Sequence, residues 1–145
     1  MPARQLPASP MPGRSRPTPR VLGAMAAGGA LGALARWGLT LVMGPWDGST
    51  LPVTTLLANL LGCLAIGMLA GLPALARGPD WLRGFLITGI LGGFTTFSAL
   101  ALEVGVLAVT GRGLVAAGYL GLTLVGGLLA VALGRWATGT WRVPR

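Results

Sequence analysis

The chain has 145 residues, of which 53% are hydrophobic and only 10% are charged, against about 25% charged residues in a typical soluble domain. A soluble globule with so few charges would expose a large apolar surface, so lipid is the expected surroundings of most of the chain. With three acidic residues, one cysteine and no histidine, the sequence excludes a side-chain zinc site, and we do not expect an enzyme.

The first 20 residues form a segment rich in Pro, Arg and Ser. Such a segment cannot bury apolar surface and is expected to be disordered. The apolar run that follows it is too long for a signal peptide, so we interpret the tail as retained and cytoplasmic. The net charge of +8 does not indicate a nucleic-acid partner, because the arginines flank apolar segments instead of covering one face of a domain.

Four apolar segments reach the length of about 20 residues that a membrane helix needs: 21–43, 52–72, 81–110 and 114–136. They predict an all-α integral membrane protein with a transmembrane domain over 21–137 and a short basic tail over 138–145. The connections are short and contain Gly, Pro and Asp, so neighbouring helices should be antiparallel. The spans are rich in glycine, which lets helices approach closely, and four short helices can hardly enclose a pore, so we expect a dimer.

The arginine positions predict how the chain lies in the membrane. Nine arginines fall in the N-terminal tail, around the second connection and near the C-terminus, whereas only Arg112 lies in the other two connections. Because positive residues stay on the cytoplasmic side, both termini should be cytoplasmic in a multi-pass protein of the cell membrane.

The middle of the third segment reads Gly92-Gly93-Phe94-Thr95-Thr96-Phe97-Ser98. Each interior glycine costs a helix about 1 kcal/mol, and the two threonines offer hydroxyls that compete for backbone hydrogen bonds. We predict a helix broken at Gly92–Thr96, whose freed carbonyls would suit a hard cation such as sodium. The alternative is an unbroken, glycine-rich packing face.

Two pairs of polar residues are spaced to share a helical face: Thr55 with Asn59 in the second segment, and Tyr119 with Thr123 in the fourth. A polar stripe in a membrane helix tends to face the bundle interior. It could hold helices together, for about 1 kcal/mol, or offer N–H and O–H donors to an anion. Tyr119 could also be a packing or interfacial aromatic residue.

Two charged residues lie within the apolar segments. Glu103 follows Thr96 and Leu100 at the i, i+4, i+7 spacing and is either an interfacial anchor or part of a polar path. Arg36 should pair or reach the interface, because charge at depth is costly, and a structural role is expected for it.

These residues resemble the CrcB/Fluc family of fluoride channels. Gly28-Gly29-Ala30-Leu31-Gly32-Ala33-Leu34-Ala35-Arg36-Trp37 is similar to the family's first-helix motif, and Asn59-Leu60-Leu61-Gly62 to its Asn-x-x-Gly motif. The run from Gly92 to Ser98 is similar to its third-helix signature. The resemblance covers residues 21–137.

The resemblance implies an antiparallel, dual-topology dimer with two pores that export fluoride from the cytoplasm. A structural sodium ion, which is not transported, would be held at the two-fold axis by the carbonyls of Gly92 and Thr95 from each subunit. The residues assigned to the fluoride path are Asn59, Phe97, Ser98, Thr55, Thr96, Glu103, Tyr119 and Thr123.

The sequence departs from the family pattern at two neighbouring positions and in its charge distribution. Leu100 stands where the family usually has a second pore phenylalanine, and Ala99 where it has a hydroxyl residue. A protein that inserts in both directions should also show little arginine asymmetry. Both departures fit a chain of fixed orientation that pairs with a paralogue, although a homodimer stays open.

Two other functions would suit a small four-helix membrane protein. A small multidrug-type transporter relies on a glutamate in its first helix, and residues 21–43 contain no carboxylate. A structural membrane subunit would have no need of Asn59 together with a broken third helix.

Overall fold

The computed structural model describes residues 16–139, and within them the chain forms helices and no strand. Three helical spans are long and apolar enough to cross a membrane, and a fourth helix is apolar but shorter. They are α1 (Pro19–Met43), the third span (Asp80–Val109), α7 (Gly113–Ala137) and the shorter α2 (Val53–Leu69). The four predicted segments are therefore confirmed as helices, and most of both predicted tails lies outside the described residues.

The ends of these helices follow local chemistry. Thr18 caps α1, accepting a hydrogen bond from the amide of Val21 at 3.4 Å, and Pro19 takes the first helical position, so α1 begins two residues before the predicted boundary. Helix α2 ends at Leu69 and not at residue 72, because Ala70 and Gly71 form a turn. The connection after this turn contains α3 (Pro73–Ala76), a single helical turn where the sequence predicted only a loop.

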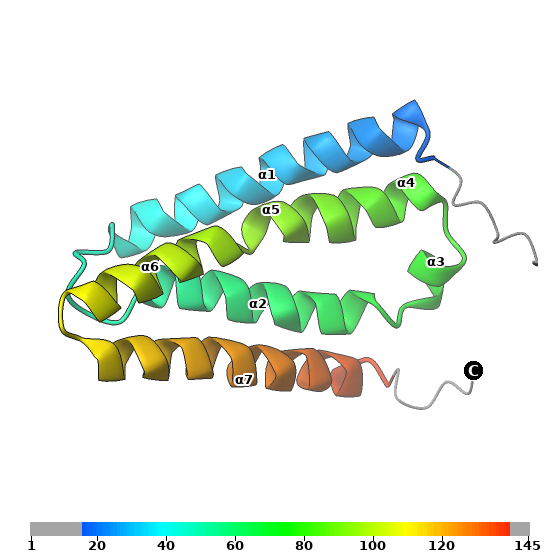
Figure 1. Cartoon of the computed structure of the whole chain (residues 1–145). Helices are drawn as coiled ribbons and strands as arrows, with labels where there is room; N and C mark the ends of the chain where they lie inside the picture. Colours follow the sequence, from blue (N-terminus) through cyan, green and yellow to red (C-terminus); the bar gives the residue numbers. More distant parts are fainter. Residues whose placement is uncertain (1–15, 140–145) are drawn as a thin grey trace, which may run out of the picture.

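Consecutive spans run in opposite directions, as the short connections predicted (Figure 1). The start of α1, α3 and the end of α7 lie at one end of the bundle, and the connections 44–52 and 110–112 lie at the other. Those two connections are joined, because the guanidinium of Arg112 donates to the carbonyl of Ser49. Helix α1 packs along the first half of the third span, whereas α2 packs along α7.

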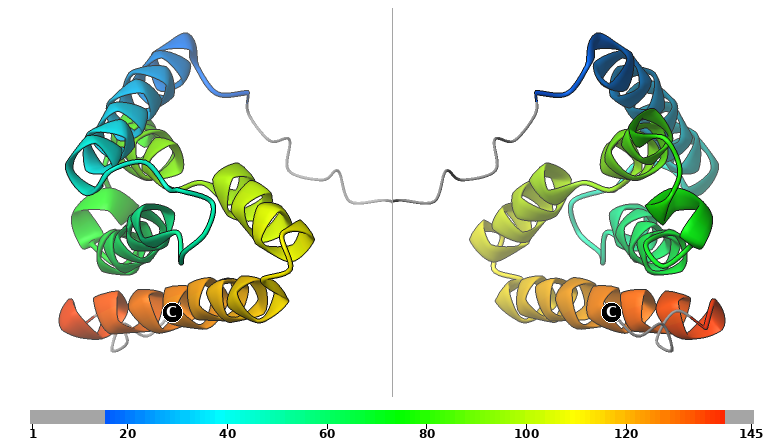
Figure 2. Two further views of the ribbon diagram at one scale, coloured as in Figure 1. Left: turned by 90° about the vertical axis from the view of Figure 1, so that its left-hand side faces the viewer. Right: turned by 90° about the vertical axis from the view of Figure 1, so that its right-hand side faces the viewer.

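The third span is interrupted, as predicted, but at its threonines. Thr95 (φ −82°, ψ 154°) and Thr96 (φ −146°, ψ 124°) are extended, whereas Gly92 and Gly93 remain helical. Figure 2 shows the part after the break displaced sideways from the part before it. In chain order the pieces are α4 (Asp80–Arg83), the π-helix η1 (Gly84–Leu91), α5 (Gly92–Phe94) and α6 (Phe97–Val109).

Glycines allow the helix pairs to approach to backbone contact. A side chain at Gly28 of α1 would overlap the carbonyl oxygen of Phe85 in η1, and one at Gly67 of α2 would overlap that of Val131 in α7. Such close approach is how helices associate in lipid. These glycines therefore serve packing within one chain and do not by themselves indicate a dimer.

Candidate functional site

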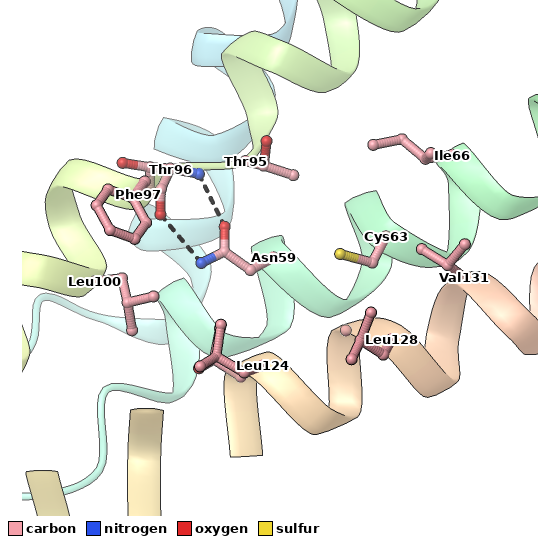
Figure 3. A pocket seen from close by; sticks show the side chains of 12 residues that line it. Asn59, Cys63, Ile66, Thr95, Thr96, Phe97, Leu100, Leu124, Leu128 and Val131 are labelled. Carbon is pink, nitrogen blue, oxygen red and sulfur yellow. Dashed lines mark hydrogen bonds between the residues drawn. The ribbon is translucent and has the colours of Figure 1, made fainter. Parts of the chain in front are cut away.

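Asn59 holds the two extended residues of the broken span in place. Its Oδ1 accepts a hydrogen bond from the amide of Thr96 at 2.8 Å, and its Nδ2 donates to the carbonyl of Thr96 at 3.1 Å (Figure 3). One side chain of α2 thus satisfies both backbone groups of a residue that has no helical partners. Because a primary amide carries two N–H groups, one further N–H of Asn59 can serve another acceptor.

The second half of the broken span begins directly at this contact. The hydroxyl of Thr96 accepts from the amide of Ala99 at 3.1 Å and so caps α6, and it lies 3.1 Å from the hydroxyl of Ser98. Unpaired amides and the helix dipole make the start of a helix electropositive. The positive end of α6 therefore lies beside Asn59.

A hollow of about 540 Å³ opens on this face of the protein. Phe97 lies at its edge with 76% of its surface exposed, and Figure 3 shows its ring next to Asn59 and Leu100. The far wall is formed by apolar side chains of α7. The hollow thus combines a few polar groups near the break with an apolar surround, and its lining is Asn59, Cys63, Ile66, Thr95, Thr96, Phe97, Leu100, Thr123, Leu124, Gly127, Leu128 and Val131.

The break also changes the partners of three backbone carbonyls. In an uninterrupted helix the amides of Thr96 and Ala99 would bond to the carbonyls of Gly92 and Thr95, but here they bond to Asn59 and to the Thr96 hydroxyl. Those two carbonyls therefore lose their usual donors. The carbonyl of Gly93, by contrast, has a side-chain donor, because Nε of Arg36 in α1 donates a hydrogen bond to it at 3.3 Å.

Arg36 thus has the structural contact that its depth predicted. Its guanidinium lies on the face of α1 that also carries Gly28 and Gly32, which are spaced four residues apart and allow the third span to approach. The charge is used to satisfy a carbonyl released by the break.

A second set of polar side chains, Thr55, Glu103 and Tyr119, is buried between α2, α6 and α7. The carboxylate of Glu103, 9% exposed, accepts from the hydroxyl of Thr55 at Oε1 and from the hydroxyl of Tyr119 at Oε2, both at 2.7 Å. The hydroxyl of Thr123 instead donates to the backbone carbonyl of Tyr119 at 2.8 Å. The interpretation of Glu103 as an interfacial anchor is therefore wrong, and Tyr119, fully buried, is no interfacial aromatic residue.

Comparisons with known proteins show which family the chain resembles. A family model described as "CrcB-like protein, Camphor Resistance (CrcB)" matches residues 23–135. A protein named "Fluoride-specific ion channel FluC" from Rhodospirillum centenum is 46% identical over 111 residues, covering 74% of this chain and 88% of that protein. One of the same name from Chloroflexus aurantiacus is 43% identical over 121 residues, covering 80% and 96%. "Fluoride-specific ion channel FluC 2" from Nocardia farcinica is 42% identical over 133 residues, covering 86% and 91%.

The chain belongs to the CrcB family. The suspected resemblance is confirmed, and family membership together with the apolar helices establishes a multi-pass membrane protein. The similar CrcB proteins carry the names of ion channels, which agrees with the expectation that this chain is not an enzyme.

Leu100, one of the two residues at which the sequence departs from the expected family pattern, lies between Asn59 and the buried carboxylate of Glu103. It is 3% exposed and packs with Leu56, Leu107 and Tyr119, while one side of it lines the hollow. On the same helical face, Thr96 contacts Asn59 and Glu103 contacts Thr55. The i, i+4, i+7 spacing of Thr96, Leu100 and Glu103 therefore predicted correctly that the three share one face.

Two parts of the site in this CrcB protein were not predicted from its sequence. Leu124, Leu128 and Val131 of α7 form the apolar wall of the hollow, and their i, i+4, i+7 spacing is the signal that could have shown it. The packing of Trp46 and Leu51 of the first connection against the hydrophobic cluster that contains Leu100 and Tyr119 was also not predicted. No periodic pattern marks residues in such a loop.

Proposed function

We propose that this protein is a fluoride-selective passive channel, which exports fluoride from the cytoplasm of the cell and relieves its toxicity. The names of the similar CrcB proteins support fluoride as the ion. The observation that carries the proposal is the contact of Asn59 with the broken span, because it leaves an amide N–H beside an open hollow at the positive end of α6.

The hollow offers the chemistry that a small, strongly hydrated anion requires. Fluoride leaves water only if close donors replace its hydration shell, which is the general logic of selectivity by pore lining. Asn59 supplies an amide, Thr96 and Ser98 supply hydroxyls, and the ring edge of Phe97 carries partial positive charge. A larger anion such as chloride would fit the same donors less closely.

The buried group would form the next part of the fluoride path. Thr55 and Tyr119 both direct their hydroxyls at Glu103, so fluoride that reaches them must compete with this carboxylate for the same donors. Thr123 would connect the hollow with the buried polar residues, because it lines the hollow and its hydroxyl donates to the backbone carbonyl of Tyr119.

A structural sodium ion would fit the break. The carbonyls of Gly92 and Thr95 lose their usual helical donors, as described above, and carbonyl oxygen is a suitable ligand for a hard cation. When bound, the ion would add fixed positive charge near the hollow and so favour an anion there.

A second subunit would complete the path. The face that carries Phe97 and the hollow is open in a single protomer, and an antiparallel partner would enclose two pores, one on each side of the two-fold axis. The start of α1 and the end of α7 lie at one end of the bundle. Among the described residues, the helix ends and connections there carry five arginines, whereas those at the other end carry only Arg112. The five are Arg16, Arg20, Arg77, Arg83 and Arg135. That asymmetry favours cytoplasmic termini, a single orientation and an oppositely oriented paralogue as partner.

The test is fluoride efflux from liposomes that contain the purified chain, followed with a fluoride electrode, with chloride efflux as the control. We expect fluoride efflux without chloride efflux. Efflux from the chain alone would show that no paralogue is needed. Absence of fluoride efflux both alone and with a coexpressed paralogue would contradict the proposal.

A further inference from the structure

A second hollow, of about 450 Å³, lies at the arginine-rich end of the bundle, far from the break. It is formed where the start of α1 meets the start of α4, and its polar lining comes from Arg16, Arg20, Thr18 and Asp80, with Trp81 at its side. The guanidinium of Arg20 lies 5.2 Å from the centre of the Trp81 ring, at cation–π distance. This stacking holds one arginine in place at the hollow.

The positive charge of this hollow is only partly balanced by the protein. Two arginines and one aspartate line it, yet within residues 16–139 neither guanidinium lies within 4.0 Å of a carboxylate oxygen. Two arginines against one aspartate, with no ion pair formed, leave an excess of positive charge that favours an external anion. Guanidinium groups suit phosphate in particular because they can donate two parallel hydrogen bonds.

The position of the hollow along the bundle indicates which phosphate it meets. At about 1.5 Å per residue the 25 residues of α1 span about 38 Å, which exceeds the hydrocarbon core of about 30 Å. Helix α1 is therefore long enough for its first turn to reach the level of the lipid headgroups. Trp81 beside it is of the residue type that is enriched at this level.

We propose that this hollow binds the phosphate of an anionic phospholipid headgroup, with Arg16 and Arg20 as its ligands. The site is separate from the ion path, so it does not depend on the proposed fluoride function. Binding would fix the arginine-rich end of the protein to a leaflet that contains anionic lipid.

Native mass spectrometry of the purified protein, titrated with phosphatidylglycerol or phosphatidylcholine, tests the proposal. We expect a phosphatidylglycerol to bind more tightly than phosphatidylcholine, with affinity falling about fivefold for each arginine removed in Arg16→Gln and Arg20→Gln. Arg83→Gln is the matched control, because Arg83 is exposed at the same end and does not line the hollow. It should leave the affinity unchanged.

Three results would overturn the assignment. Equal affinity of the wild type and the double variant Arg16→Gln/Arg20→Gln would show that the hollow does not bind the lipid. An equal loss in Arg83→Gln would indicate general attraction to a basic surface. Displacement of the lipid by millimolar inorganic phosphate would identify a soluble anion as the occupant instead. In addition, chain-brominated phosphatidylglycerol should quench a larger part of the tryptophan fluorescence in the wild type than in Trp81→Phe, in which the other four tryptophans remain.

Discussion

Two polar groups lie along the contact between α2 and α6, and they use their hydrogen bonds differently. At the break, Asn59 bonds to the backbone of Thr96 beside an open hollow. Deeper in the bundle, Thr55 and Tyr119 bond to the side chain of Glu103, with little solvent access. The first group holds an irregular backbone and retains a donor for a ligand, whereas the second satisfies a carboxylate within the protein.

This difference suggests separate tasks. In lipid, an irregular backbone persists only where its N–H and C=O groups find partners, and Asn59 provides both partners for Thr96. The buried group has no such backbone role, because α6 is regular around Glu103. We therefore expect changes at Asn59 to affect fold and function together, and changes around Glu103 to affect stability less.

The largest effect is expected for Asn59→Ala. Removal of the amide leaves the N–H and C=O of Thr96 without partners, which should destabilise the protein by about 2–4 kcal/mol and abolish fluoride efflux. SDS-induced unfolding and liposome efflux measure the two effects. Asn59→Asp retains an acceptor for the Thr96 amide but no amide N–H, so it should unfold less easily than Asn59→Ala and still lack efflux. Leu61→Ala, at an exposed position of α2, is the control and should leave both unfolding and efflux unchanged. Unaltered efflux in Asn59→Ala would show that Asn59 is not part of the fluoride path.

A smaller effect is expected for Arg36→Met. The carbonyl of Gly93 would lose its charged donor, at a cost of about 1–2 kcal/mol, and SDS-induced unfolding measures this loss. Arg36→Lys keeps the charge without the planar guanidinium and should recover only part of the stability. Full stability of Arg36→Met would mean that the break does not depend on α1.

The independence of the two polar groups can be measured with double-mutant cycles. Thr55→Val and Tyr119→Phe remove two donors to one carboxylate, so their effects on unfolding should couple by about 0.5–1 kcal/mol. Asn59→Ala and Tyr119→Phe share no partner and should add. Strong coupling of this second pair would show that the two groups act as one network and would break the comparison.

The smallest effect is expected at Asp47, in the connection between α1 and α2. Hydrogen bonds from the amide and hydroxyl of Ser49, and from those of Thr50, lower the pKa of Asp47 to about 2. Since this pKa lies below the ordinary value of 3.8, the turn should be held by the carboxylate above about pH 4 and released as the pH falls towards 2.

Hydrogen exchange of the Ser49 and Thr50 amides measures this turn. At pH 5 these amides should exchange more slowly in the wild type than in Asp47→Ala, and at pH 2 the two proteins should agree. Asp47→Asn keeps an acceptor oxygen but no charge, so at pH 5 its amides should exchange at a rate between those of the wild type and of Asp47→Ala, and the wild type should lose its advantage over Asp47→Asn as the pH falls to 2. Equal exchange in the wild type and Asp47→Ala at pH 5 would show that the carboxylate does not hold this connection.

Local sequence predicted much of this arrangement. The apolar segments gave the helices, and the glycines and threonines of the third segment predicted its interruption. The position of the break at Thr95–Thr96 depends on Asn59, which is distant in sequence. In addition, β-branched residues such as threonine adopt the extended conformation more readily than the helical one. The π-helix before the break packs closely on α1, where Gly89 meets Gly28, and no local pattern predicted either the π-helix or this contact.

The chemistry of single residues was less predictable than the faces on which they lie. The spacing placed Thr55 and Asn59 on one face, but it could not show that one bonds to a carboxylate and the other to a backbone. Glu103 had two interpretations because its burial depends on contacts with Thr55 of α2 and Tyr119 of α7, which are distant in sequence. Such contacts arise only from the folded chain.

The most direct test of the central claim, that the ion path runs along the broken span, is fluoride efflux through Phe97→Ile. Leu102→Ile, at an exposed position of the same helix, is the matched control. We expect Phe97→Ile to fold and to lose fluoride efflux, while Leu102→Ile conducts as the wild type does. Undiminished efflux through Phe97→Ile would place the path elsewhere and contradict the account.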